Sequence, residues 1–183
     1  MTPEGCIDGT LVIELADGWS AGSVAGRLLS ELGARVLKLE PPEGDRLRLI
    51  EPRAADGSSA AFQTLNSNKD SLVLDLNSEQ GRDTLTVLAG RADILMTDRT
   101  TIDDRAAGLD LDTFTAEDPR LIHCHFSPFG RSGPLCEQNG GDLIAQAMGG
   151  VIATTGHPGG LPHKAGPPLA VHNAALMGGA SML

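Results

Sequence analysis

Five short apolar segments alternate with segments of helical pattern along this 183-residue chain, and this alternation most limits the folds open to it. Strands that alternate with helices at short spacing predict βαβ units and therefore a parallel sheet. Right-handed crossovers would make the fold Rossmann-like, an α/β sheet flanked by helices. The expected strands cover residues 10–15, 35–40, 71–76, 93–96 and 120–126.

The segments between the expected strands carry recognisable helix ends. Ser20 is placed to cap a helix that runs to about residue 32 and ends at Gly33. Asn77 or Ser78 is placed to cap a second helix, which continues to about residue 89. Further helical segments are expected at 102–116, at 142–148 and from about residue 171, with a loop rich in Gly and Pro at 156–168.

Several residues have a simple structural interpretation. Gly18, Gly22 and Gly26 recur every four residues and put small residues on one helix face, so that a strand or a ligand can approach closely. Asp142 is expected to cap its own helix. Asp45 and the two nearby arginines that follow it are expected to form a solvated charge cluster.

Composition narrows the possible functions. Apolar residues make up 40% of the chain, which is enough to bury a core, and we expect one domain over residues 1–183. The formal net charge is −10, which repels polyanions and argues against a nucleic-acid footprint. Small anionic ligands stay possible, because a few arginines and backbone amides suffice to bind them.

The cysteines and the apolar segments indicate in which cellular compartment the protein is expected. Cys6, Cys124 and Cys136 are odd in number and far apart, which suits free thiols in a reducing compartment. Residues 1–5 are polar and show no signal-peptide pattern. No apolar run approaches the ~20 residues needed to span a bilayer. We therefore expect a cytoplasmic protein without a membrane partner.

Several motifs agree in order and spacing with one protein family. The chain resembles the N-terminal half of the family III CoA-transferases, the group that holds formyl-CoA and carnitine CoA-transferases and α-methylacyl-CoA racemase. The resemblance implies a Rossmann-like large domain and CoA as the carrier of the transferred acyl group. The matching motifs lie at residues 32–42, with Gly44 and Asp45, and at 66–71, 74–76, 91–94, 118–122, 129–134 and 140–150.

The resemblance also draws attention to one residue of the motif at 164–171. In the family this segment delivers an Asp that attacks the acyl-CoA thioester and forms a covalent intermediate. An ungapped match places Val171 there, and an alkyl side chain cannot attack a thioester. His172 is the nearest alternative base, although one residue along a helix turns the side chain by ~100°. No catalytic residue is therefore predicted within the chain.

The expected CoA contacts follow from the resemblance. Ser20 could equally be a helix cap, and Trp19 could pack either on adenine or on the core. Asp103 and Asp104 add negative charge beside the segment expected to hold phosphate, so reduced CoA affinity is expected. The positions implied for CoA binding are Trp19, Ser20, Leu74, Asp98, Arg99 and Arg105.

Three functions remain open on the sequence. The first is an acyl-CoA transferase, moving CoA between an acyl-CoA and a carboxylic acid, that is incomplete or needs a partner chain. The second is a catalytically degenerate structural or regulatory subunit. The third is an α-methylacyl-CoA racemase, which is disfavoured because Gly141 and Val171 stand where the resemblance implies its His and Asp.

The expected partners are a second copy of the chain or a complementary CoA-transferase chain. The resemblance implies interlocked dimers of chains about twice as long. The pattern at 174–180 reads as a helix that is cut, so a truncated chain is expected. The glycine-rich loop at 156–160 corresponds to one that covers the site in the family, and it could equally be a plain connector.

His123, Cys124 and His125 could in principle contribute to a metal site. The two histidines would face the same side of a strand and could form part of a zinc site. No second ligand pair stands at a recognised spacing, and the resemblance implies a sheet strand without metal. No metal ligand is therefore predicted.

Overall fold

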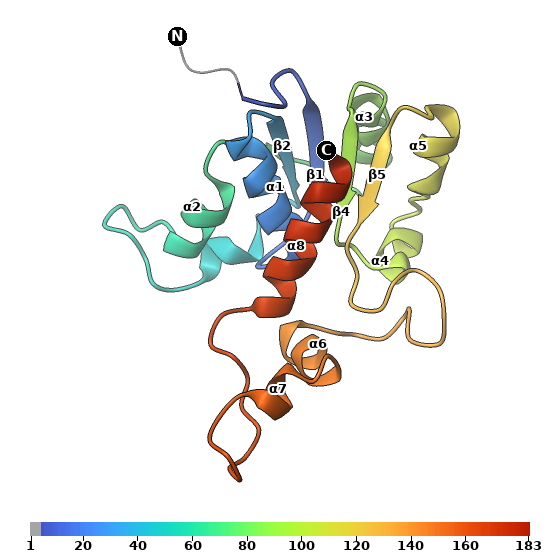
Figure 1. Cartoon of the computed structure of the whole chain (residues 1–183). Coiled ribbons are helices and arrows are strands. Elements are labelled where there is room, and N and C mark those ends of the chain that lie inside the picture. The colour runs from blue at the N-terminus through green and yellow to red at the C-terminus, as the bar shows by residue number, and fades with distance from the viewer. Residues whose placement is uncertain (1–4) are drawn as a thin grey trace.

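The chain folds around a five-stranded parallel sheet with the strand order β3-β2-β1-β4-β5, seen in the computed structural model (Figure 1). The structure describes residues 5–183, so the first four residues of the expected domain and polar N-terminus lie outside the described part. The predicted Rossmann-like α/β fold is confirmed. The strands are β1 (Leu11–Leu15), β2 (Arg35–Glu40), β3 (Lys69–Val73), β4 (Ile94–Thr97) and β5 (Ile122–His125).

Helices cover both faces of this sheet (Figure 1). The first face carries α1 (Ala21–Glu31), α2 (Ala60–Asn66) and α8 (Leu169–Met182), and the second carries α3 (Glu79–Ala89) and α5 (Asp112–Glu117). None of the helices within residues 5–183 is long and apolar enough to cross a bilayer. The remaining elements are η1 (Arg46–Leu49), α4 (Thr101–Ala106), α6 (Asp142–Met148) and α7 (Val151–Thr154).

The two faces of the sheet form two separate apolar clusters, because successive strand residues point to opposite sides. Val12 packs with the side chains of α1 and α8, whereas its neighbour Ile13 packs with those of α3. Met96 and Leu95 divide in the same way on β4. The near-continuous apolar runs in the sequence are therefore those of strands that are covered on both faces.

The predicted helix ends largely agree with the structure. Ser20 accepts a hydrogen bond from the Ser23 amide at the start of α1, and Ser78, rather than Asn77, caps α3. The third strand differs from the prediction, because it begins at Lys69 and ends at Val73 instead of spanning 71–76. Its partner β2 ends at Glu40, which pairs with Val73, so the residues that follow have no strand left to join.

Four charged side chains meet inside the molecule on the α1 side of the sheet. The Lys38 ammonium lies 3.1 Å from Glu14 Oε1 and 2.7 Å from Asp45 Oδ2, and it donates to the Ala16 carbonyl at 2.6 Å. Lys69 Nζ lies 2.8 Å from Glu14 Oε2, an ion pair that is not well aligned as a hydrogen bond. The prediction that Asp45 is solvated is therefore wrong, because Asp45 is only 1% exposed.

Burial and pairing act in opposite directions on the two lysines. Burial alone would lower the pKa of Lys38, but Glu14 and Asp45 together raise it above its ordinary value. For Lys69 burial prevails and lowers the pKa, since Glu14 is its only close carboxylate partner among residues 5–183. A lysine held between two carboxylates stays charged when buried, because each partner compensates part of its lost hydration.

Gly26 makes room for this ionic cluster. A Cβ added there would lie 1.9 Å from Glu14 Oε2, and one added at Gly22 would lie 2.9 Å from the Ala16 Cβ. Gly22 and Gly26 therefore form the predicted face of small residues on the first helix, and they allow β1 to approach α1 closely. Gly18 lies in the loop before α1, with a positive φ of 72°. The contact that requires glycine at position 26 is with a charged side chain.

We expect Gly26→Ala to destabilise the fold by about 3 kcal/mol, because the added methyl displaces a buried carboxylate from its two lysines. The measurement is the free energy of unfolding in urea. The matched control is Gly179→Ala in α8, where a Cβ would meet nothing within 4 Å. That control should gain about 0.5–1 kcal/mol from helix propensity. Equal stabilities of the two variants would contradict the packing argument.

Candidate functional site: a cleft at the carboxyl ends of the strands

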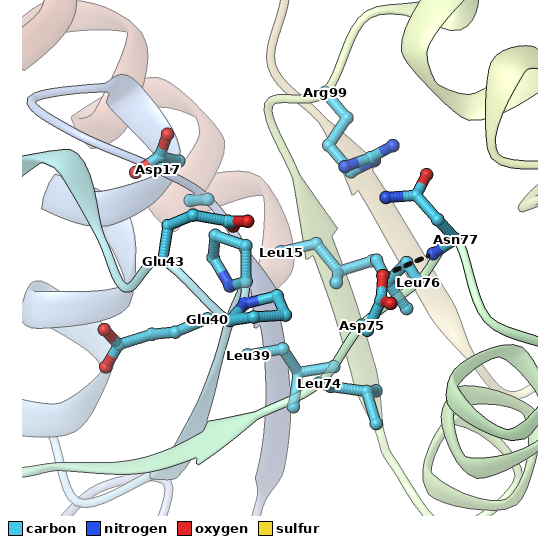
Figure 2. Close-up of a pocket in the computed structure, with 13 residues that line it drawn as sticks. Leu15, Asp17, Leu39, Glu40, Glu43, Leu74, Asp75, Leu76, Asn77 and Arg99 are labelled. Atoms are coloured by element: carbon cyan, nitrogen blue, oxygen red, sulfur yellow. Dashed lines mark hydrogen bonds between the residues drawn. The ribbon is translucent and has the colours of Figure 1, made fainter.

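The main cleft lies at the carboxyl ends of the parallel strands, at the edge where open α/β sheets bind ligands. The strand order reverses between β1 and β4, and the loops after these two strands face each other there. Figure 2 shows the cleft, a cavity of about 260 Å³. It is lined by Leu15, Ala16, Asp17, Leu39, Glu40, Pro41, Pro42, Glu43, Leu74, Asp75, Leu76, Asn77 and Arg99.

The floor of the cleft is apolar and its rim is charged. Leucines from the ends of β1 and β2 and from the segment after β3 form the floor (Figure 2). Asp17 and Glu43 lie on one side of the opening and Arg99 lies on the other. Of the lining residues, Arg99 is the only cation.

The charges of the rim are largely neutralised within the chain. Arg48 donates two hydrogen bonds to Glu40, at 2.7 and 2.8 Å, and Arg46 Nε donates to Asp17 Oδ2 at 2.6 Å. Burial alone would raise the pKa of Glu40, but bonds from Arg48, Ser71 and the Asp45 amide lower it to about 2. Glu40 is thus a fixed anion with its partners in place.

Arg99 is the side chain best placed to meet an anionic ligand in the cleft. Its Nε donates to Asp104 Oδ1 at 2.6 Å, and its side chain is 27% exposed. A phosphate that bound here would therefore compete with the Asp104 carboxylate for the guanidinium. The sequence predicts weakened phosphate binding because acidic residues lie near this segment, and this contact is one way in which Asp104 would weaken it.

The structure places Arg105 away from Arg99. Arg105 lines a second cavity, of about 300 Å³, and lies 3.3 Å from Glu137 Oε1. The two arginines suggested as joint phosphate ligands are therefore directed into different cavities. Arg99 precedes α4 and Arg105 lies in its last turn, and the sequence alone could not show which arginine faces the cleft.

Trp19 and Ser20 occupy the loop after β1, beside the strand-order reversal. Trp19 is 45% exposed, so its ring is available to a ligand and is not a core side chain. The Ser20 hydroxyl accepts from the Ser23 amide at 3.1 Å, which is the helix-cap contact. Of the two readings of each residue, the structure favours an open ring for Trp19 and a capping role for Ser20.

Asp98 connects the two loops across the reversal point. It follows β4 directly, and its Oδ2 accepts a hydrogen bond from the Asp17 amide at 3.3 Å. Burial raises the pKa of Asp98 to about 6, although bonds from Ser20 and from the Asp17 amide act against this shift. Leu74 lines the cleft from the segment after β3.

Val171 lies in the first turn of α8 and packs against the core cluster on the α1 face. The amides of Ala170 and Val171 donate to Asp142 Oδ1, at 2.8 and 3.3 Å. The expectation that Asp142 caps its own helix is therefore wrong. The cap position of α6 is Gly141, and Asp142 caps α8.

Asp142 is held in this position by two further side chains. Lys164 Nζ lies 3.2 Å from Asp142 Oδ2, and Gln146 Nε2 donates to the same oxygen at 2.6 Å. Burial alone would raise the pKa of Asp142, but Lys164, Gln146 and the two amides lower it. His172 Nδ1 lies 2.8 Å from the Pro168 carbonyl, so its ring bonds to its own helix.

Sequence reasoning missed several residues of the cleft. Pro41 and Glu43 follow β2, and Asp75 and Asn77 follow β3. The available signal was position for Pro41 and Asn77, because each directly follows a predicted strand, where the sheet edge forms ligand clefts. Asp75 was placed inside the predicted third strand, so its position gave no such signal. In the part of the chain that the structure describes, no three His, Cys, Asp or Glu side chains converge to hold a metal ion.

Comparison with known proteins agrees with this fold. The chain belongs to CoA-transferase family III, whose family model matches residues 7–183. It is 37% identical over 166 residues to an acetyl-CoA:oxalate CoA-transferase of Acetobacter aceti, and 37% identical over 167 residues to a succinate–glutarate CoA-transferase of Agrobacterium fabrum. These matches cover 90% and 87% of this chain but only 42% of each relative.

Solved structures show the same fold over nearly the whole of this chain. A CAIB/BAIF family protein from Brucella suis superposes with a TM-score of 0.91 at 34% identity, covering 98% of this chain and 48% of that one. A hypothetical protein from Mycobacterium tuberculosis has a TM-score of 0.86 at 27% identity. The resemblance drawn from the motifs is thereby confirmed, and the chain spans less than half the length of these relatives.

Asp98 gives the stability of the chain a pH dependence that can be measured. Its folded pKa of about 6 lies above its ordinary value of 3.8, so the folded state binds the proton more tightly. Its contribution to the free energy of unfolding therefore falls as pH rises from about 4 through 6. We expect Asp98→Asn to be more stable than the wild type at pH 7.5, by up to about 3 kcal/mol, and to lose this advantage near pH 4.

The measurement is urea unfolding at both pH values. The control is Asp83→Asn, which changes an exposed carboxylate on α3 and should shift stability little at either pH. A destabilised Asp98→Asn at pH 7.5, or an effect that does not change with pH, would show that Asp98 is not held as a strained anion.

Proposed function

We propose that this chain forms the CoA-binding part of an acyl-CoA transferase, which moves CoA between an acyl-CoA and a carboxylic acid. The observation that carries the proposal is a family III domain whose cleft lies at the carboxyl ends of the strands, with Arg99 in its lining. The exposed Trp19 follows Asp17, a lining residue, in the loop after β1. The proposal concerns the CoA-binding part and the class of reaction, and it names no acyl donor or acceptor acid. A cytoplasmic location is part of the same proposal.

The arrangement of the cleft suggests how CoA would lie in it. Arg99 would bind a phosphate, exchanging its contact with Asp104 for one with the ligand. The exposed ring of Trp19 offers a flat surface for adenine, and Leu74 belongs to the apolar floor. Asp98 and Ser20 fix the loop that presents Trp19, and Arg105 has no part in this cleft.

The transfer reaction needs a nucleophilic carboxylate, which would form an anhydride with the acyl group and release CoA as a thiolate. Position 171 carries an alkyl side chain, so a partner chain would have to supply this carboxylate. Large apolar side chains exposed on α6 and α8 support such a partner, either a second copy or a complementary CoA-transferase chain. They are Leu143, Ile144, Met148, Leu176 and Met177.

The second candidate is a degenerate subunit that binds CoA or a partner without turnover. Val171 and the Arg99–Asp104 contact favour it, since both weaken steps that transfer requires. A racemase-like function is disfavoured, because Gly141 and Val171 carry no group that could move a proton.

Trp19 is the only tryptophan of the chain, so its fluorescence reports on the loop after β1, which supplies Asp17 to the cleft. Titration with CoA should change this fluorescence, and Arg99→Gln should weaken the binding by about tenfold through loss of a charge-assisted bond. The control Arg120→Gln removes an exposed arginine that pairs with Asp118, and it should bind as the wild type does. A wild type that leaves CoA unbound would refute the proposed cleft.

A second experiment separates the transferase from the degenerate subunit. With an acyl-CoA, we expect no hydroxylamine-sensitive adduct on the wild-type chain and a measurable adduct on Val171→Asp, detected by intact mass. Val171→Asn is the matched control, since it has similar shape without a nucleophile. An adduct on the wild type would overturn the interpretation of Val171. CoA binding without an adduct on Val171→Asp would favour the degenerate subunit.

A further inference from the structure

The second cavity, on the α5 side of the edge strand β5, contains a pair of histidines that the proposed CoA cleft does not use. His123 and His125 are two positions apart on β5, so both side chains point to the same face. Both line this cavity of about 300 Å³, and their ring centroids are 6.5 Å apart with the planes at 75°. The His123 side chain is only 7% exposed.

Each ring has one buried nitrogen without a hydrogen-bond partner among residues 5–183. These atoms are His123 Nε2 and His125 Nδ1. A buried polar atom that is left unpaired costs about 1–3 kcal/mol, so two of them in one cavity require a physical explanation. A ligand that accepts electron pairs from imidazole nitrogen would supply one.

The neighbours of the rings indicate which nitrogens carry protons. His125 Nε2 lies 2.8 Å from the Arg99 carbonyl oxygen, which can only accept, so Nε2 donates and Nδ1 keeps a lone pair. His123 Nδ1 lies 3.7 Å from Asp112 Oδ1, so this carboxylate favours the proton on Nδ1 and a lone pair on Nε2.

This arrangement is the one in which proteins hold metal-binding histidines. Such a histidine usually directs its outer N–H to a carboxylate or a backbone carbonyl, which fixes the ring and leaves the other nitrogen free for the metal. Here the Arg99 carbonyl occupies this outer position for His125. The Asp112 carboxylate lies on the outer side of His123, at 3.7 Å, which is longer than a hydrogen bond. The arginines of the wall are already paired, Arg131 with Asp112 and Arg105 with Glu137.

We propose that His123 Nε2 and His125 Nδ1 bind a divalent transition-metal ion of the zinc class. Imidazole nitrogen is a preferred ligand of these ions, and water would complete the coordination, because no third protein donor is in place within the described residues. The Asp104 and Asp110 carboxylates in the cavity wall would offset part of the positive charge of the ion.

The test is calorimetric titration of the tag-free chain with Zn²⁺ at pH 7.5. We expect one ion per chain, and a loss of affinity of tenfold or more in the double variant His123→Asn, His125→Asn. The matched control is His157→Asn, His163→Asn, which removes two exposed histidines of the loop after α7 and should bind as the wild type does. A wild type that does not bind Zn²⁺, or a double variant that binds equally well, would overturn the proposal.

A second variant keeps the histidines and so does not depend on the fold of the double variant. Asp112→Asn should weaken Zn²⁺ binding by about tenfold, the usual effect of losing the outer partner of a metal-binding histidine. Arg131→Gln breaks the same Arg131–Asp112 pair but leaves the carboxylate beside His123, so it should retain affinity. Equal losses in the two variants would mean that only the ion pair matters, and would overturn the role given to Asp112.

Discussion

The structure depends on the buried contact between Glu14 and two lysines, because this contact joins three adjacent strands through their side chains. Glu14 lies on β1, Lys38 on β2 and Lys69 on β3, and Asp45 binds Lys38 from the loop that follows β2. Buried charges are tolerated only when their partners are correctly placed, so a shift in strand register would leave one unpaired. The same contacts hold the loop that forms one wall of the candidate cleft.

Most of the fold could be predicted from the sequence, because strands and helix caps are set by neighbouring residues. Ser20 and Ser78 cap the helices that they precede, and β2 has the predicted ends. The errors come from contacts that form only in the folded molecule. Asp45 looked solvated beside two arginines, but Lys38 draws it inside, and β3 stops where β2 has no more residues to pair with.

The candidate site could be predicted only as a set of loops. The resemblance put most of the expected CoA contacts in the loops after β1 and β4, and parallel strands present such loops at one edge of the sheet. It could not show that Arg99 and Arg105 enter different cavities, since the direction of a side chain on a short helix depends on tertiary packing. Asp142 is a similar case, because its partner amides are at the start of a helix 28 positions along the chain.

The contact between Asp142 and α8 also joins two parts of the molecule, the layers around the sheet and the segment with α6 and α7. α6 packs on α7 and on α8, and α6 and α7 together project from the layered base of the molecule (Figure 1). The bonds from Asp142 to the first amides of α8, with the contacts of Gln146 and Lys164, fasten this projection. Because so few contacts hold it, we expect this part of the chain to open more readily than the sheet, next to position 171.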